Sequence, residues 1–174
     1  MLKIKSYVKV NSIEEAYELN QKKTAVVLGG MVWLKMGNRN ISTAIDLSGL
    51  GLDGIQETDE EFVIGCMTTL RELETDKRLN EYTQGAVRES VRHIVGVQFR
   101  NCATVGGSIW GRYGFSDVLT MFLGMDTWVE LHNAGKIPLT EFVNRKKDND
   151  ILVNIIVKKQ PLRVCYMSQR NTKT

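Results

Sequence analysis

Two pairs of adjacent glycines, each preceded by a short run rich in apolar residues, constrain the fold of this chain most strongly. The run Thr24–Leu28 leads into Gly29–Gly30, and the run Asn101–Val105 leads into Gly106–Ser108. A buried strand that ends in Gly-Gly can turn sharply and leave consecutive amide N–H groups uncovered. Such an array, or the start of the helix behind it, holds an anion without a charged side chain.

Two such arrays on one small protein predict a ligand with a diphosphate in its middle, which is the chemistry of a dinucleotide. Two ordinary tight turns are the alternative interpretation, because Gly-Gly is a common turn signal. Other phosphate-binding signatures are missing from the sequence. Residues 29–34 lack the Gly-x-Gly-x-x-Gly spacing of a Rossmann turn, and no P-loop or Gly-x-Ser-x-Gly elbow occurs.

Composition excludes several classes of function. The chain has 174 residues and a formal net charge of +3, which is too small to indicate a nucleic-acid partner. No run is apolar and long enough to predict a membrane span, and Met1–Lys5 does not resemble a signal peptide. The three isolated cysteines favour a cytoplasmic location. Neither they nor His93 and His132 have the spacing of metal ligands, so we expect no metal site.

The first fifty residues alternate between strand and helix patterns. The capping box Ser12–Glu15 predicts the start of one helix, and a second, short helix is expected to stop at Gly37. Strands are expected over Lys3–Val10, Thr24–Leu28 and Thr43–Leu47. A strand–helix–strand unit of this kind is typical of parallel strands.

The remainder of the chain predicts a second, mixed α/β unit. Glycines in residues 49–54 punctuate the chain, and we place the boundary between the two lobes at residues 53 and 54. Helices are expected over residues 78–96 and 117–123, the second with Ser116 as its N-cap and Gly124 at its end. Strands are expected over residues 62–65, 101–105, 127–131 and 151–157, and residues 163–167 are expected to pair with the last of these.

The second glycine segment belongs to a longer motif. Residues 97–109 (VQFRNCATVGGSI), followed by Ser116–Asp117, closely resemble the Arg-Asn-x-Ala-Thr-[Ile/Val]-Gly-Gly-Asn-Ile…Ser-Asp signature of a flavoprotein family. That family comprises the FAD-binding subunits and domains of the molybdenum hydroxylases, such as xanthine dehydrogenase and the medium chain of carbon monoxide dehydrogenase. Residues 26–30 resemble the other flavin loop of the family, and the resemblance runs from the first strand to Arg170.

The resemblance implies a two-lobed FAD-binding fold of the molybdopterin-dehydrogenase type, α/β with α+β character. Residues 1–53 would form a small parallel β/α lobe, and residues 54–170 a second, mixed or antiparallel lobe. FAD would lie between the two lobes. The family continues into a further small domain, which we expect to be absent from this chain.

The resemblance also implies which residues contact FAD. The first loop would line one side of the diphosphate, Thr104–Ser108 the other, and Asp117 would accept a hydrogen bond from a ribose hydroxyl. Ile94–Val95 would lie near the flavin ring, and Ile151–Leu152 would back the ring or the adenine. The predicted cofactor site comprises Val26, Val27, Leu28, Gly29, Gly30, Met31, Val32, Trp33, Ile94, Val95, Ala103, Thr104, Gly106, Gly107, Ser108, Ser116, Asp117, Ile151 and Leu152.

Simpler roles stay open for several of these residues. Asp117 could be a first-turn acid favoured by the helix dipole, and Ile94–Val95 could be core residues. Arg100 could brace the motif loop instead of touching FAD. The chain also departs from the family pattern, because Met31–Val32 replace polar residues and residues 112–115 are bulkier than usual.

The function that the resemblance implies is that of a flavoprotein oxidoreductase subunit. Electrons would pass from iron–sulfur clusters on a partner subunit, through FAD, to NAD or another acceptor, while a molybdopterin subunit oxidises the substrate. We predict no catalytic acid or base in this chain, because the flavin carries the chemistry. Two alternatives are a non-catalytic assembly or binding module that has lost flavin affinity, and a flavin enzyme that acts alone.

Overall fold

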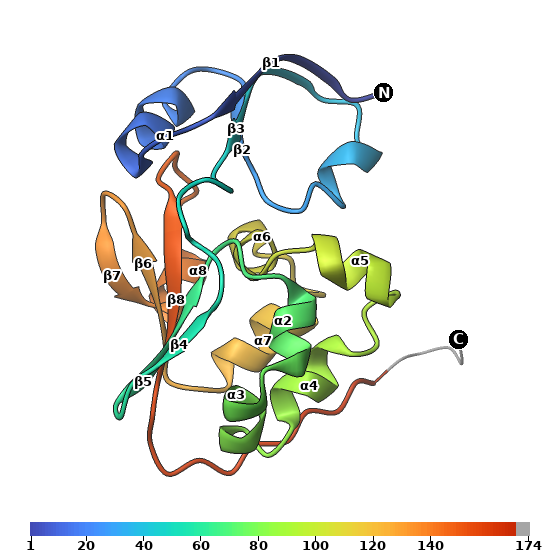
Figure 1. The fold of residues 1–174 in the computed structure, drawn as a ribbon, viewed down its shortest axis with the longest axis vertical. Helices are drawn as coiled ribbons and strands as arrows, with labels where there is room; N and C mark the ends of the chain where they lie inside the picture. The colour runs from blue at the N-terminus through green and yellow to red at the C-terminus, as the bar shows by residue number, and fades with distance from the viewer. Residues whose placement is uncertain (170–174) are drawn as a thin grey trace.

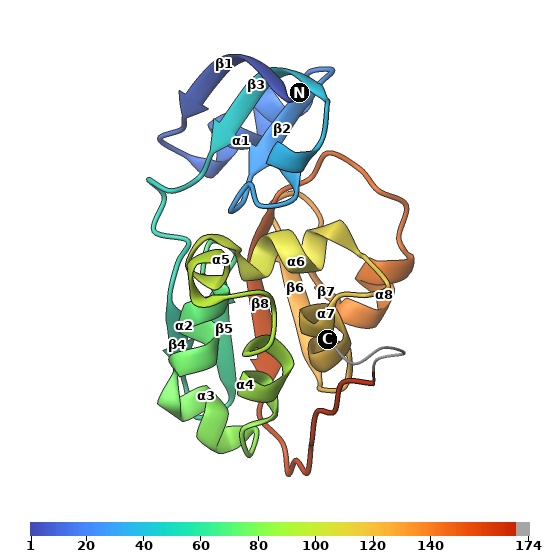
Figure 2. The ribbon, with the colours of Figure 1, turned by 90° about the vertical axis from the view of Figure 1, so that its right-hand side faces the viewer.

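Two β-sheets of different topology organise the chain. The computed structural model describes residues 1–169. Figures 1 and 2 show the smaller sheet above the larger one, joined by the extended segment 47–54. One sheet has three parallel strands and the other has five antiparallel strands, so the predicted mixed α/β fold with one parallel and one antiparallel unit is confirmed.

The three-stranded sheet has the order β1-β3-β2, and both pairings are parallel as expected. Parallel pairing needs crossover connections, because the chain must return to the end of the sheet at which the previous strand began. The elements of this unit are β1 (Lys3–Lys9), α1 (Ile13–Asn20), β2 (Ala25–Leu28), the 3-10 helix η1 (Leu34–Met36) and β3 (Asn40–Asp46).

Helix α1 begins where the sequence predicts. The Ser12 hydroxyl accepts a hydrogen bond from the amide of Glu15 at 3.1 Å, and the Glu15 carboxylate accepts one from the amide of Asn11 at 2.8 Å. The N-cap bond forms as expected, whereas the Glu15 carboxylate binds the amide of the residue before the N-cap, so the reciprocal bond of the predicted capping box is not made. The helix buries Ala16 against the sheet.

The five-stranded sheet has the order β4-β5-β8-β6-β7. Strand β8 is paired along both edges, and its consecutive residues Ile155 and Ile156 are both buried, so both of its faces are covered and its β-branched sequence suits the position. Ile155 pairs with Ile64 on one side and with Val129 on the other, and all three side chains are buried. The strands are β4 (Ile55–Glu57), β5 (Glu61–Gly65), β6 (Thr127–Leu131), β7 (Gly135–Pro138) and β8 (Leu152–Lys158).

Short helices pack against this sheet and form the larger hydrophobic core. Figure 2 shows α2, α4, α6 and α7 in front of the strands. The buried side chains of Phe62, Leu73, Val87 and Phe122 belong to one cluster that joins the sheet to these helices. The helices are α2 (Leu70–Thr75), α3 (Lys77–Tyr82), α4 (Ala86–Val91), α5 (Val97–Cys102), α6 (Val105–Gly111), α7 (Asp117–Leu123) and α8 (Leu139–Asn144).

Three expected elements are wrong. The helix expected over residues 78–96 is broken into α3 and α4, because Gln84 and Gly85 adopt positive φ angles of 50° and 82°. Residues 101–105 form no strand: α5 ends at Cys102 and α6 begins directly afterwards, with Thr104 as its N-cap. Residues 163–167 lie in no strand of the described chain and cross the helices as an irregular segment.

The lobe boundary stays a prediction, although it falls between the two sheets. The first sheet ends at Asp46 and the second begins at Ile55. The predicted second lobe extends to Arg170, which lies outside the described residues.

Candidate functional site

A cleft of about 870 Å³ lies between the loop that follows β2 and the helices α5, α6 and α7. Both β-sheet units contribute to its walls. Most of the predicted cofactor residues line it, namely Val26, Val27, Gly29, Gly30, Met31, Val32, Trp33, Ile94, Val95, Ala103, Thr104, Gly107, Ser108, Ser116 and Asp117. Residues up to 91 positions apart in sequence therefore share one cavity, and its size falls within the range of ligand pockets.

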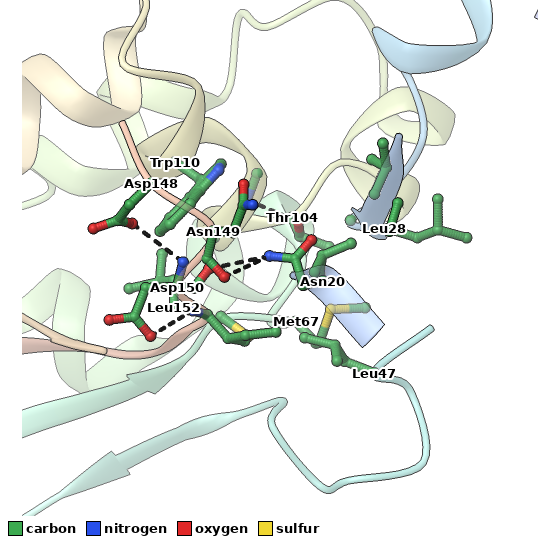
Figure 3. Close-up of a pocket in the computed structure, with 18 of the residues that line it drawn as sticks. Asn20, Leu28, Leu47, Met67, Thr104, Trp110, Asp148, Asn149, Asp150 and Leu152 are labelled. Carbon is green, nitrogen blue, oxygen red and sulfur yellow. Dashed lines mark hydrogen bonds between the residues drawn. The ribbon is translucent and has the colours of Figure 1, made fainter. Parts of the chain in front are cut away.

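A second cavity of about 270 Å³ adjoins this cleft and shares Val27, Gly29 and Thr104 with it (Figure 3). On its far side, the Asn20 side chain of α1 donates a hydrogen bond to the carbonyl of Asn149 at 2.8 Å. This bond joins the first unit to the loop before β8. The remaining predicted residues, Leu28, Gly106, Ile151 and Leu152, line this smaller cavity.

The first glycine loop presents a row of uncovered amides. Within the described part of the chain, the N–H groups of Gly29–Trp33 have no hydrogen-bond acceptor. Met31 adopts a left-handed conformation with φ of 57°, and residues 29–33 all line the cleft. Uncovered amides in a loop can bind an anion such as a phosphate, and this role of the loop stays a prediction.

The second glycine pair does not present such a row, and here the expectation is wrong. The amides of Val105 and Gly106 donate to the carbonyls of Thr68 and Cys66, at 2.8 Å and 2.9 Å. The amide of Gly107 donates to the Thr104 hydroxyl at 3.1 Å. This segment offers the cleft the hydroxyl proton of Thr104 and the bare surface of Gly107, while the Ser108 hydroxyl donates to the carbonyl of Thr104 at 3.0 Å.

Close backbone packing explains the glycines of both pairs. A Cβ atom on Gly106 would lie 2.4 Å from the carbonyl oxygen of Cys66, and one on Gly30 would lie 1.8 Å from that of Cys102. A Cβ atom on Gly29 would lie 2.8 Å from the Thr104 hydroxyl. The two glycine segments therefore lie against each other, and the lack of side chains allows the first loop to reach the start of α6.

Ser116 and Asp117 begin α7 at one end of the cleft. The Ser116 hydroxyl accepts from the amide of Leu119 at 3.2 Å, as expected for an N-cap. The Asp117 carboxylate accepts a hydrogen bond from the hydroxyl of Tyr166. Asp117 is thus a first-turn acid that also lines the cleft, and one of its oxygens is engaged by the C-terminal segment.

Arg100 braces the motif loop, which is one of the alternatives left open by the sequence. Its guanidinium is buried and pairs with the buried carboxylate of Glu74 at 2.8 Å, and it donates to the carbonyl of Ile94 at 3.1 Å. Burial raises the pKa of the Glu74 carboxyl, but hydrogen bonds and charge from Arg100 and Arg71 outweigh that effect, so its pKa is lowered overall. The pair holds the α4–α5 loop at the mouth of the cleft.

Ile94 and Val95 occupy this loop and differ from each other. Ile94 is half-buried and packs against the main core, whereas 78% of Val95 is exposed. A core role is therefore wrong for Val95. The α4–α5 connection also breaks the helical pattern that suggested such a role, because Val95 has φ of 52°.

Sequence reasoning missed several cleft residues. Phe99, Tyr113 and Phe115 line the larger cavity, and Arg39 and Trp110 line both. The sequence singles out residues 112–115 for bulky side chains that could cover the cofactor or compete for its space, without assigning them to the site. Their aromatic character is the signal that points to ligand contact.

The groups present suit a dinucleotide. Uncovered amides fit a diphosphate, hydroxyl groups and Asp117 fit ribose hydroxyls, and the apolar walls fit a planar ring. Among the described residues, no group of three or more His, Cys, Asp or Glu side chains could hold a metal ion. No helix in residues 1–169 has the length and apolar character to cross a membrane.

Comparison with known proteins defines the class. The sequence model of the FAD binding domain in molybdopterin dehydrogenase matches residues 2–159, so the chain belongs to this family. The resemblance inferred from the motif is confirmed, and FAD is the cofactor of the family.

Two curated relatives are similar to most of the chain. It is 26% identical over 170 residues to the 6-hydroxypseudooxynicotine dehydrogenase complex subunit alpha of Paenarthrobacter nicotinovorans, with 89% of this chain and 57% of the relative covered. It is 27% identical over 170 residues to the uncharacterized protein YgfM of Escherichia coli K12, with 93% and 62% covered. The chain therefore spans about three-fifths of the length of these relatives.

Solved structures share the fold. A Cu,Mo-CO dehydrogenase in its cyanide-inactivated form superposes with a TM-score of 0.82 at 23% identity, covering 92% of this chain and 61% of that one. Quinoline 2-oxidoreductase from Pseudomonas putida 86 superposes with a TM-score of 0.80 at 17% identity, covering 90% and 59%. At these identities the likeness concerns the fold alone.

Proposed function

We propose that this chain is the FAD-binding, electron-transfer subunit of a molybdenum-hydroxylase-type oxidoreductase. The observation that carries the proposal is the row of uncovered amides at Gly29–Trp33, which faces a cleft between the two sheets. Family membership supports the choice of FAD, and one relative bears the name of a dehydrogenase complex subunit.

The residues of this chain would bind and orient the cofactor. The amides of Gly29–Trp33 would hold the diphosphate from one side and the Thr104 hydroxyl from the other, and the Ser108 hydroxyl, which donates to the carbonyl of Thr104 at 3.0 Å, would rotate to join it. Asp117 would accept a ribose hydroxyl with the oxygen that Tyr166 leaves available. Val26, Val27 and the other apolar predicted residues would exclude water from the ring, which shifts the balance between its oxidation states.

When bound, FAD would supply the redox chemistry and exchange electrons with iron–sulfur clusters of a partner subunit and with NAD or another acceptor. We propose iron–sulfur and molybdopterin subunits as partners and the cytoplasm as the location. No side chain of this chain is assigned as an acid or base, so the protons that accompany the electrons would come from water.

A matched binding experiment tests the cofactor part of this proposal. The purified chain is incubated with FAD, separated from free FAD by gel filtration, and examined by visible absorbance. We expect flavin to coelute with the protein in roughly one-to-one ratio, and the variant Thr104→Val to retain less. A colourless protein would favour the assembly module instead, in keeping with the apolar side chains of Met31–Val32.

The partner part needs native material. Affinity purification of the tagged chain from its own cells should bring down proteins that contain iron, acid-labile sulfide and molybdenum. Recovery of the flavin-loaded chain free of all three would contradict the proposed complex and leave FAD binding intact.

A further inference from the structure

Three aromatic side chains, Trp33, Tyr113 and Phe115, meet at the cleft and are called here the aromatic triad. Trp33 comes from the loop after β2, and the other two come from the loop between α6 and α7. The Trp33 and Phe115 ring centroids are 6.0 Å apart, and the Tyr113 ring stacks on that of Phe115 at 5.1 Å and 15°. All three residues line the 870 Å³ cleft.

The triad is exposed to an extent that packing does not explain. The exposed fractions of Trp33, Tyr113 and Phe115 are 58%, 46% and 67%. None of the three belongs to either hydrophobic cluster of the described chain. Adjacent exposed aromatic rings are unfavourable in water and mark binding sites on protein surfaces.

The loop that carries Tyr113 and Phe115 is anchored. Arg112 adopts a left-handed conformation with φ of 50°, and its guanidinium lies 3.9 Å from the centroid of the Phe142 ring. The same side chain donates a hydrogen bond to the carbonyl of Arg145, and Lys147 donates to the carbonyl of Gly111 at 3.2 Å. These contacts fix the loop on α8, so the rings are held at the cleft.

We propose that the aromatic triad is the stacking wall for a planar heteroaromatic ring of FAD. This inference rests on the proposed function, adds Tyr113 and Phe115 to the predicted cofactor residues, and gives Trp33 a ring contact rather than a place on the diphosphate loop alone. Flat apolar faces without a charge match a ring whose area is large and whose edges carry the polar groups. Trp33 is the last residue of the row of uncovered amides, so one continuous loop would hold the diphosphate and contact the ring.

FAD carries two such rings, the isoalloxazine and the adenine. The triad recognises the flat aromatic face that both rings share. Two fragments of the cofactor show which ring it binds. FMN contains the isoalloxazine without adenine, and ADP contains the adenine without isoalloxazine.

The experiment measures the dissociation constants of FAD, FMN and ADP by isothermal titration calorimetry. The variants Trp33→Leu and Phe115→Leu remove a ring, and the matched controls Trp33→Phe and Phe115→Tyr keep one. We expect the leucine variants to bind FAD at least about fivefold more weakly, since stacking one base on an aromatic side chain contributes on that scale. The controls should stay within about twofold of the wild type.

Tryptophan fluorescence is a second readout, which reports the contact even where the affinity for FAD is unchanged. FAD should quench the tryptophan emission of the wild type, and Trp33→Phe should lose the part of that quenching that comes from Trp33, while the part from Trp110, which also lines the cleft, remains. Circular dichroism and thermal unfolding verify that each variant is folded, as expected for side chains so exposed.

The outcomes separate the two proposals. Leucine variants that bind FAD as tightly as the wild type, with quenching unchanged in Trp33→Phe, would overturn the stacking wall and leave the proposed function standing. A wild type that binds none of the three ligands would overturn both. Weaker FMN binding in the leucine variants would assign the wall to the isoalloxazine, and weaker ADP binding would assign it to the adenine.

Discussion

Gly30 and Cys102 touch through their backbones: a Cβ atom on Gly30 would lie 1.8 Å from the carbonyl oxygen of Cys102. Gly30 belongs to the loop after β2, and Cys102 ends α5, so this contact joins the parallel unit to the antiparallel one. The loop that presents the uncovered amides is therefore positioned by direct contact with the segment that precedes α6.

We expect Gly30→Ala to destabilise the protein by about 2 kcal/mol or more, because a methyl group at this position overlaps backbone atoms that cannot rotate away. Urea unfolding measures the loss. The variant should also bind FAD more weakly, since the first loop must move away from α6.

Gly96→Ala is the matched control for this glycine. Its backbone is extended, and the nearest atom to an added Cβ is 3.7 Å away. Stability should change by less than about 0.5 kcal/mol. Equal effects of the two substitutions would contradict the contact between the loops.

The buried Arg100–Glu74 pair predicts a strong effect of removing one charge. Glu74→Gln leaves the buried guanidinium without its counter-charge and should cost about 3 kcal/mol in unfolding free energy. Glu89→Gln is the control, because the Glu89–Arg92 pair is exposed and contributes little. A similar loss in both variants would contradict the distinction between buried and exposed pairs.

The same pair predicts a pH dependence. The pKa of Glu74 is lowered in the folded protein, so the unfolded state binds the proton more readily. The stabilisation is complete above the unfolded pKa, at about pH 4.3, and is lost as the pH falls through the folded value. Urea unfolding between neutral and acidic pH should show a shallower acid-side loss in Glu74→Gln than in the wild type. Parallel pH profiles would contradict this assignment.

Cysteine reactivity should divide the three thiols into two groups. Burial raises the pKa of the Cys66 thiol to about 12, so it stays protonated at neutral and mildly alkaline pH. Cys102 and Cys165 are exposed. A thiol reagent at pH 8 should therefore modify two thiols quickly in the native protein and the third only after unfolding. Rapid reaction of all three in the native state would contradict the buried position of Cys66.

Tyr166 fastens the C-terminal segment to α7 through Asp117. Tyr166→Phe removes a hydrogen bond to a charged acceptor, and we expect a loss of about 1.5 kcal/mol. Limited trypsin digestion should cut faster after Arg163, because the segment is released more often. Tyr113→Phe is the control, since its hydroxyl makes no hydrogen bond to the rest of residues 1–169. Unchanged cleavage in Tyr166→Phe would contradict the fastening role.

Elements with strong local signals could be predicted from the sequence. The capping residue Ser12 lies where expected, because its hydrogen bond reaches only three residues along the chain. The β-branched run of β8 also predicted a strand, but not its central position in the sheet. The motif around Thr104 identified the family, and the cleft brings together residues that the motif alone could not relate in space.

Features that depend on distant contacts could not be predicted. The run 101–105 was expected to be a strand from its apolar character, but it divides between the end of α5 and the start of α6, whose first two amides donate to the carbonyls of Thr68 and Cys66. For the same reason, the second glycine pair has no uncovered amides. The Tyr166–Asp117 bond spans 49 residues, and no local pattern relates its partners.

The central claim is that the amides of Gly29–Trp33 hold the diphosphate of FAD. Its most direct test is a titration of nitrogen-15-labelled protein with FAD, followed through the backbone amide resonances. We expect the amide resonances of Gly29–Trp33 to shift and saturate as FAD is added, because these free donors gain an acceptor. The resonances of Val105–Gly107 should shift less, because their amides already have partners. Unchanged resonances of Gly29–Trp33 at saturating FAD would contradict it.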